Sequence, residues 1–301
     1  MDEAWSEDVA AQTCESALAS ANVDTMSSPR LIRLGTNAVY KVDTSCGKII
    51  ARVSPNDYDA ELLAKQIEFS SWLVENGFET SEPLLRDVVW IGGRATTLWQ
   101  YLESDNPPVS IMRPLGSLVR KLHTLTDEYS GNLPTWEPLG RLGERLDSVP
   151  SDDSFTEGDR SVLQEWRDHL SSAAGALNFE LPQGPIHGDV HTGNTVYSHD
   201  RLYLIDLDRI ANGPREWELA QPLVAHRMFA KDDRGIDSFM EGYGWDLRKF
   251  NGATALVDLR ALFMTSWLLT LPRDERVKNE IRNRILYWRN PDGDWPLWRP
   301  R

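Results

Sequence analysis

Short runs in which apolar and polar residues alternate recur in the first third of the chain. Such runs, separated by turns that contain Gly, Ser and Asn, are typical of half-buried strands. Strands are expected at residues 30–34, 38–43, 48–53, 84–91 and 95–101. The pattern therefore predicts a five-stranded antiparallel sheet.

Apolar residues at helical spacing mark the other elements. One main helix is expected at about residues 59–75, after an Ala-rich helix at about 5–21. Beyond residues 104–108, a Pro-containing linker, helices are expected at 109–125, 159–176, 236–243, 254–270 and 274–289, and another begins within 213–220. We expect an α+β protein with a sheet-containing region, residues 1–102, and a mainly helical region, residues 103–301.

The composition is that of an ordinary globular chain, and it narrows the classes of partner. Of the 301 residues 41% are hydrophobic, which is enough to bury a core in each region. The formal net charge of −14 argues against nucleic acid or an anionic membrane as a partner, because phosphate groups repel such a surface. Cys14 and Cys46 cannot form a disulfide framework, and neither a signal peptide nor a membrane span is apparent. We expect a cytoplasmic location, and the oligomeric state stays open.

Two neighbouring segments that contain carboxylates carry the candidate chemistry. The first is His187-Gly188-Asp189-Val190-His191-Thr192-Gly193-Asn194, and the second is Leu204-Ile205-Asp206-Leu207-Asp208. Phosphoryl transfer needs a base that orients the attacking hydroxyl and oxygen ligands for magnesium. Asp189 is our candidate for the base, and Asn194 and Asp206 are our candidates for the metal ligands.

The first segment resembles the Brenner motif of the aminoglycoside phosphotransferase and choline kinase family, and Asp206 follows at about the family's spacing. The resemblance implies a two-lobed, protein-kinase-like fold that uses ATP or GTP with Mg²⁺. It also implies that Asp189 is the base, that Asn194 and Asp206 bind magnesium, and that His187 and Gly188 shape the loop. Protein kinases carry Arg and Lys where this chain has Gly188 and His191, so the chain resembles the small-molecule branch.

The same resemblance implies roles for residues outside the two segments. Glu218 stands near a helix start where the family usually has an Asp that braces the catalytic loop. Gly35, Thr36 and Asn37 resemble the turn of a nucleotide-covering hairpin, although protein kinases have three glycines there. Adenine would bind against the backbone of the lobe-connecting hinge, which we expect at Gln100, Tyr101 and Leu102.

Arg52 is our candidate for the cation that binds nucleotide phosphate, in the place where kinases carry Lys. Its guanidinium can hold two phosphate oxygens, whereas Lys presents a point charge. Lys48, on the same face of the strand, is the alternative. A Glu of the main helix should steer this cation, and both Glu68, which we favour, and Glu61 qualify on sequence.

The acceptor is not readable from the sequence, although the acidity favours a cation. Carboxylates that we expect to border the acceptor are Asp208, Asp232, Asp233, Asp237 and Glu241. An aminoglycoside, another antibiotic or an amino sugar would suit them, and choline-like alcohols and nucleosides remain open. Two other interpretations of the loop are a zinc site at His187, Asp189 and His191 and a polar loop without chemistry. An inactive nucleotide-binding regulator is the alternative function.

Overall fold

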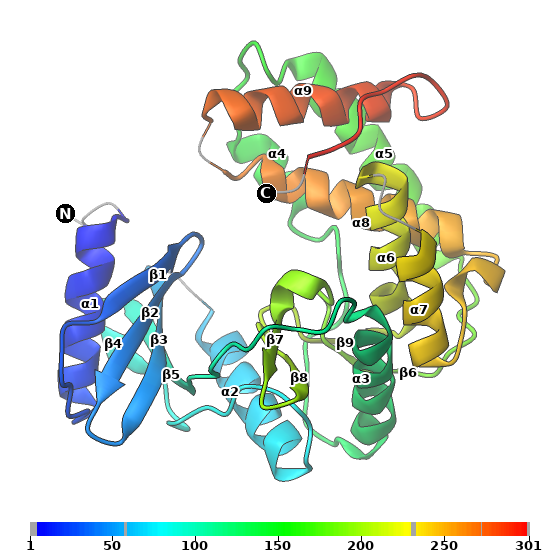
Figure 1. Cartoon of the computed structure of the whole chain (residues 1–301). Coiled ribbons are helices and arrows are strands. Elements are labelled where there is room, and N and C mark those ends of the chain that lie inside the picture. Colours follow the sequence, from blue (N-terminus) through cyan, green and yellow to red (C-terminus); the bar gives the residue numbers. More distant parts are fainter. Residues whose placement is uncertain (1–4, 57–58, 230–232, 272, 300–301) are drawn as a thin grey trace. The chain divides into compact units, whose positions relative to one another are not determined.

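The computed structural model describes residues 5–56, 59–229, 233–271 and 273–299, which form two compact units (Figure 1). The first unit consists of the described residues up to Pro108 together with Glu128–Pro134 and Gly193–Ile210. The second consists of Val109–Asp127, Thr135–Thr192 and the described residues from Ala211 onward. Each unit is thus built from separate stretches of sequence, and the candidate catalytic segment, residues 187–194, is divided between them after Thr192.

A five-stranded antiparallel sheet forms the centre of the first unit. Its strands are β1 (Arg30–Leu34), β2 (Ala38–Thr44), β3 (Gly47–Asn56), β4 (Val89–Ile91) and β5 (Arg94–Gln100). They are ordered β1-β2-β3-β5-β4, and each neighbouring pair is antiparallel. The predicted sheet is confirmed, but β4 begins at Val89 rather than at residue 84. Glu82, Pro83 and Leu84 pair with β5 before this strand, and the β4–β5 ladder starts at Val89.

Helix α1 (Glu7–Ser20) lies along the sheet and completes its core (Figure 1). The helix is capped by Ser6, whose hydroxyl accepts the Val9 N–H at 3.3 Å. Its buried face packs on the apolar side chains of the strands; this core contains Ala10, Cys14, Leu18, Ala38, Tyr40, Val42, Ala51, Val53 and Leu98. Helix α2 (Ala60–Glu75) is capped by Asp59, and its Phe69 and Trp72 pack edge-on against Tyr129.

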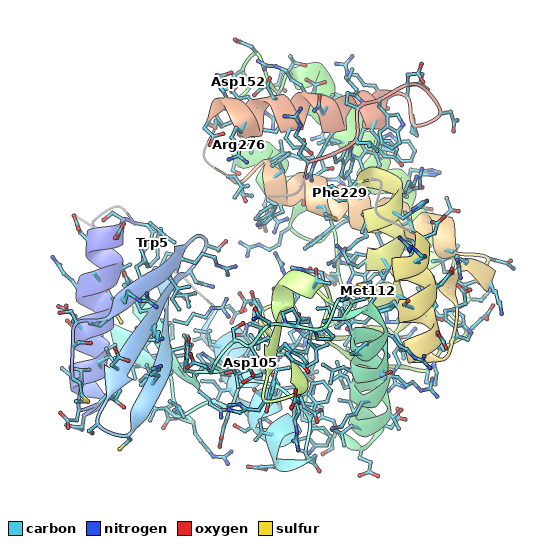
Figure 2. All side chains as sticks on the ribbon, in the orientation of Figure 1. Trp5, Asp105, Met112, Asp152, Phe229 and Arg276 are labelled. Atoms are coloured by element: carbon cyan, nitrogen blue, oxygen red, sulfur yellow. The ribbon has the colours of Figure 1, made fainter. Side chains whose placement is uncertain are left out.

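A small hairpin also belongs to the first unit, and the candidate metal ligands lie at its open end, where the chain enters and leaves it. It consists of β7 (Thr195–Ser198) and β8 (Arg201–Leu204), joined by His199 and Asp200 with φ of 47° and 60°. The Ile205 N–H donates to the carbonyl of Asn194 at 2.9 Å, which closes the open end. Asp105, labelled in Figure 2, accepts the His199 N–H at 2.7 Å and so anchors the turn.

Helices dominate the second unit, as predicted. They are α3 (Met112–Leu125), α4 (Leu142–Ser148), α5 (Glu157–Gly175), α6 (Glu216–Phe229), α7 (Asp233–Tyr243), α8 (Ala253–Leu268) and α9 (Glu275–Arg289), with a two-stranded ladder of β6 (Gln183–Ile186) and β9 (Ala211–Pro214). The mainly apolar helix α8 packs against both α5 and α6 (Figure 1). None of the helices in the described part of the chain is long and apolar enough to cross a membrane.

Close packing of α3 on α7 depends on two glycines. A Cβ at Gly116 would collide with the carbonyl oxygen of Phe239, and one at Gly242 would collide with that of Arg113. The helices are further joined by a buried hydrogen bond of 2.8 Å between His123 Nδ1 and the Tyr243 hydroxyl. The short helix α4 is absent from our sequence prediction, because seven residues give too little helical periodicity to detect.

Candidate active site

The part of the candidate catalytic loop that belongs to the second unit is held by the start of helix α6. The loop follows β6, and Gly188 has a φ of 82°, in the left-handed region that favours glycine. One carboxylate oxygen of Glu218 accepts the Gly188 N–H at 2.9 Å, and the other accepts the His187 N–H at 3.0 Å. The Trp217 indole N–H donates to the Gly188 carbonyl at 2.9 Å. Two consecutive residues of α6 thus fix the loop backbone just before Asp189.

Glu218 is buried, and burial raises its pKa to about 7. The two backbone N–H donors and the guanidinium of Arg260 oppose the increase, whereas the charge of Asp189 adds to it. A carboxyl with this pKa gains or loses its proton near neutral pH. The charge of Glu218, which accepts the two backbone hydrogen bonds of the loop, therefore changes in this pH range.

Asp189 lies at the edge of the loop and faces two basic side chains. The Arg260 guanidinium pairs with its Oδ1, and His191 Nε2 lies 3.7 Å from its Oδ2. Burial acts to raise the pKa of Asp189, but the neighbouring Arg260 and His191 outweigh it and hold that pKa well below its usual range. The side chain remains 29% exposed. Asp189 is therefore an ionised, partly accessible carboxylate held in a defined orientation.

In the first unit, Arg52 gathers two carboxylates that follow strand β8. Its Nη1 lies 3.4 Å from Asp206 Oδ1, and its Nη2 pairs with Asp208 Oδ2. Asp206 has a φ of 71°, which turns the chain sharply between the two acids. Asp208, which we predicted near the acceptor, thus contacts the candidate phosphate-binding cation. Its role towards an acceptor stays a prediction.

The turn between β1 and β2 reaches the same cluster through Asn37. With its amide oriented to satisfy its neighbours, Asn37 accepts from Arg52 Nε at 3.2 Å and donates to the Ser54 hydroxyl at 3.0 Å. Gly35 and Thr36 are exposed at the tip of the turn, whereas Asn37 is buried. The candidate nucleotide-covering turn and Arg52 therefore form one hydrogen-bonded group.

The side chains of Asn194 and Asp206 fit a magnesium ion. Asn194 can offer its amide oxygen and Asp206 its carboxylate oxygens, and oxygen ligands are what Mg²⁺ prefers. A buried Asp208 Oδ1 close by has no hydrogen-bond partner among the described residues. In that part of the chain no three His, Cys, Asp or Glu side chains gather closely enough to hold a metal ion by themselves. This set fits an ion that completes its shell with nucleotide phosphates and water better than the zinc alternative.

The remaining nucleotide candidates lie on or beside the sheet. Lys48, the alternative to Arg52, forms an ion pair with Glu103 at 3.3 Å. At the end of β5, the Gln100 N–H donates to the Glu82 carbonyl at 2.8 Å, and its own carbonyl accepts from the Ser81 hydroxyl at 3.0 Å. The other two predicted hinge residues, Tyr101 and Leu102, follow Gln100, and these two hydrogen bonds do not involve their backbone groups.

The two helix glutamates interact with Lys65 and with Tyr129. Glu61 pairs with Lys65 one turn along α2 at 2.7 Å. Glu68 is exposed. Burial of Tyr129 raises the pKa of that residue to about 12, and the negative charge of Glu68 adds to the increase. Steering of Arg52 by Glu68 stays a prediction.

The acidic residues predicted to border an acceptor are paired with bases. Asp233 lies 3.0 Å from His226, Asp237 lies 2.8 Å from Arg248, and Glu241 lies 3.1 Å from Arg113. Asp232 lies outside the described residues. A surface hollow of about 390 Å³ is lined by Asp237, Met240, Glu241, Gly244, Trp245, Asp246, Arg248 and Lys249. Two of the predicted carboxylates thus share one concave surface on α7.

Sequence reasoning missed Arg260, which contacts Asp189 from helix α8. The only local signal is a single charged residue among the buried apolar residues Leu259, Ala261 and Leu262. Such a residue needs a partner, but the sequence does not say which.

Comparison with known proteins places these observations in a family. The phosphotransferase enzyme family matches residues 30–252. Homoserine kinase from Brucella canis is 26% identical over 196 residues, covering 60% of this chain and 57% of the kinase. The match therefore spans little more than half of that relative's length.

Solved structures of kinases share the fold. An amicoumacin kinase in complex with AMP-PNP, Ca²⁺ and Ami has a TM-score of 0.76 at 15% identity, with 98% of each chain covered. A microcompartment-associated aminopropanol kinase has a TM-score of 0.71 at 16% identity, covering 91% of this chain and 94% of that one. These likenesses confirm the predicted kinase-like fold. Since the family match includes the sheet, the catalytic loop, Asn194 and Asp206, this chain belongs to the phosphotransferase enzyme family, as its loop predicted.

Proposed function

We propose that the protein is a small-molecule kinase that transfers the γ-phosphoryl group of ATP or GTP to a hydroxyl group of a small acceptor. The observation that carries the proposal is Asp189, an ionised carboxylate oriented by Arg260 on a loop whose backbone Glu218 holds. Asn194, in the same segment, and Asp206, which follows β8, would supply the metal-binding oxygens that the chemistry requires.

Asp189 would accept a hydrogen bond from the acceptor hydroxyl and align its oxygen with the γ-phosphorus. The P–O bond to the leaving nucleotide breaks as the bond to the acceptor oxygen forms, and the hydroxyl proton passes to Asp189. Because the pKa of Asp189 is held low, its main contribution is orientation rather than strong basicity, which suits a loose phosphoryl-transfer transition state.

Arg52 and Asn37 would act on the nucleotide. Arg52 presents a fork of N–H groups that can bind two phosphate oxygens, and Asn37 links it to the covering turn. Magnesium, held by Asp206 and Asn194, neutralises phosphate charge when it is bound. The inactive-regulator alternative uses the same nucleotide contacts but predicts no turnover.

The acceptor proposed here is an amino alcohol or an amine-bearing antibiotic or sugar. The similar proteins include kinases named for homoserine, amicoumacin and aminopropanol. Asp237 and Glu241 border a hollow whose size suits a small molecule, and carboxylates are the natural partners of ammonium groups.

A nucleotide-turnover assay tests the proposal. Wild type and Asp189→Asn are assayed with ATP and GTP against homoserine, aminopropanol, choline, amino sugars, aminoglycosides and neutral sugars. We expect acceptor-dependent turnover in wild type, and a loss of about 10²-fold or more in Asp189→Asn with nucleotide affinity retained. Nucleotide binding without turnover on any acceptor would favour the regulator. Turnover by Asp189→Asn within a few-fold of wild type would remove the role of Asp189.

A further inference from the structure

Arg260 is a buried cation directly behind the candidate base. Its side chain is 3% exposed on helix α8, where the neighbouring positions are mainly apolar. A charge this deeply buried is costly unless its hydrogen-bonding groups are satisfied. The groups that contact the Arg260 guanidinium therefore indicate which role the buried charge has.

The guanidinium contacts three groups with its three nitrogens. Nε donates to the Gln221 side-chain oxygen at 2.9 Å, Nη1 donates to the Gly188 carbonyl at 2.9 Å, and Nη2 pairs with Asp189 Oδ1. Two of the three acceptors belong to consecutive residues of the catalytic loop. A planar fork can hold a backbone carbonyl and the adjacent carboxylate together, which a single ammonium group cannot do.

Two aromatic rings fix the guanidinium in place. Its Cζ lies 5.1 Å from the ring centre of Trp217 and 5.3 Å from that of Phe263. Trp217 also donates its indole N–H to the Gly188 carbonyl. The same carbonyl thus receives bonds from α6 and from α8, and Arg260 has little freedom to change its angle towards Asp189.

We propose that Arg260 is the positioning residue for Asp189, holding Oδ1 so that Oδ2 is the oxygen that meets the acceptor hydroxyl. The proposal rests on the proposed kinase function and extends it to a residue beyond position 252, where the family match ends. The other carboxylate oxygen of Asp189, Oδ2, lies on the side of His191, and the Asp189 side chain is partly exposed to solvent. The charge of Arg260 also keeps Asp189 ionised in acid, while its fork sets the direction of the carboxylate.

Two substitutions separate the charge of Arg260 from its geometry. Arg260→Lys keeps the charge but loses the fork, whereas Arg260→Gln removes both. For the full-length protein we expect kcat to fall by about 10- to 10²-fold in either variant, with the nucleotide KM within about two-fold of wild type. We expect the acid limb of the pH–kcat/KM profile to move to higher pH in Arg260→Gln and to stay near that of wild type in Arg260→Lys.

A matched control is available in Arg284 of helix α9. Its side chain is 4% exposed, pairs with Glu280 at 2.9 Å, donates to the Met264 carbonyl and lies over the Trp298 ring. Arg284→Gln should lower the melting temperature to a similar degree as Arg260→Gln, but leave kcat and the pH profile of the remaining folded protein unchanged. A purely structural role for Arg260 would give the two Gln variants the same behaviour and overturn the proposal.

A double variant completes the test. Adding Arg260→Gln to Asp189→Asn should lower turnover by less than about two-fold, because the carboxylate that Arg260 positions is already gone. A further loss equal to that in the wild-type background would overturn the proposal. If Arg260→Gln does not fold, Arg260→Lys decides, since wild-type kcat in that variant contradicts a need for the fork. Absence of acceptor phosphorylation in wild type itself would instead reject the kinase function.

Discussion

The carboxylate of Glu218 accepts the backbone N–H of Gly188 at 2.9 Å, and Gly188 is the residue whose left-handed backbone turns the chain towards Asp189. Glu218 lies at the start of α6, so a helix of the second unit determines the path of the catalytic loop. Because burial raises the pKa of Glu218 to about 7, the strength of this link depends on pH near neutrality.

Glu218→Gln should change how stability depends on pH. The folded pKa of about 7 lies above the ordinary 4.5, so the contribution of the carboxyl is complete below pH 4.5 and is lost as pH rises through 7. The free energy of unfolding of wild type, relative to Glu218→Gln, should fall by up to about 3 kcal/mol across that window. Urea unfolding at pH 4.5 and 7.5 measures it, and a constant difference would contradict the raised pKa.

Glu216→Gln is the matched control for activity. Glu216 is also buried and accepts two backbone N–H groups, those of Glu180 and Leu181, each at 2.7 Å. We expect Glu218→Gln to lower kcat by about 10-fold at pH 7.5 and Glu216→Gln to leave it within about two-fold, because only Glu218 contacts the catalytic loop. Equal losses in kcat would mean that Glu218 acts through general stability.

Asp206 and Asn194 should differ in their effects on the magnesium requirement. Asp206→Ala should abolish magnesium-dependent nucleotide binding, whereas Asn194→Ala should weaken it and raise the magnesium concentration needed. Asp206→Asn should match the Ala variant while keeping the left-handed φ of 71° that Asn tolerates. Asp200→Asn, at another positive φ, controls for the backbone. Calorimetric titration over a magnesium series reports all four, and wild-type binding by Asp206→Asn would exclude the metal role.

The sheet and the motif could be predicted because their signals are local. Strand alternation identified the five-stranded sheet, and two neighbouring segments contain Asp189, Asn194 and Asp206. Arg260 reaches Asp189 across 71 positions, and Arg52 reaches Asp208 across 156. Such pairs arise from the packing of α8 on α6 and from the path of the hairpin into the first unit. No periodicity in the sequence encodes these contacts.

Asp208→Asn distinguishes two roles for this carboxylate. If Asp208 mainly anchors Arg52, the variant should raise the nucleotide KM by about 10-fold and leave the acceptor KM unchanged, because Arg52 loses one of its two carboxylate partners. If Asp208 binds the acceptor, as the sequence predicts, the acceptor KM should rise by about 10-fold and the nucleotide KM should stay unchanged. Arg52→Lys should resemble the first case, since an ammonium group cannot bridge Asp206 and Asp208 as the guanidinium does. Steady-state kinetics with each substrate varied in turn decides between the roles.

The acceptor KM should depend on salt if carboxylates of α7 attract a cationic acceptor. Asp237 and Glu241 border the hollow but are paired with Arg248 and Arg113, so their attraction is partly neutralised and only a several-fold effect is expected. With a Debye length of about 8 Å at physiological ionic strength, the acceptor KM of wild type should rise between low and high salt while kcat stays nearly constant.

Asp237→Asn combined with Glu241→Gln should flatten this dependence of the acceptor KM on salt. Asp168→Asn, an exposed carboxylate paired with Arg167 on α5, should leave it unchanged. A neutral or anionic best acceptor, or a KM that ignores salt, would reject the acidic acceptor site while leaving the kinase function intact.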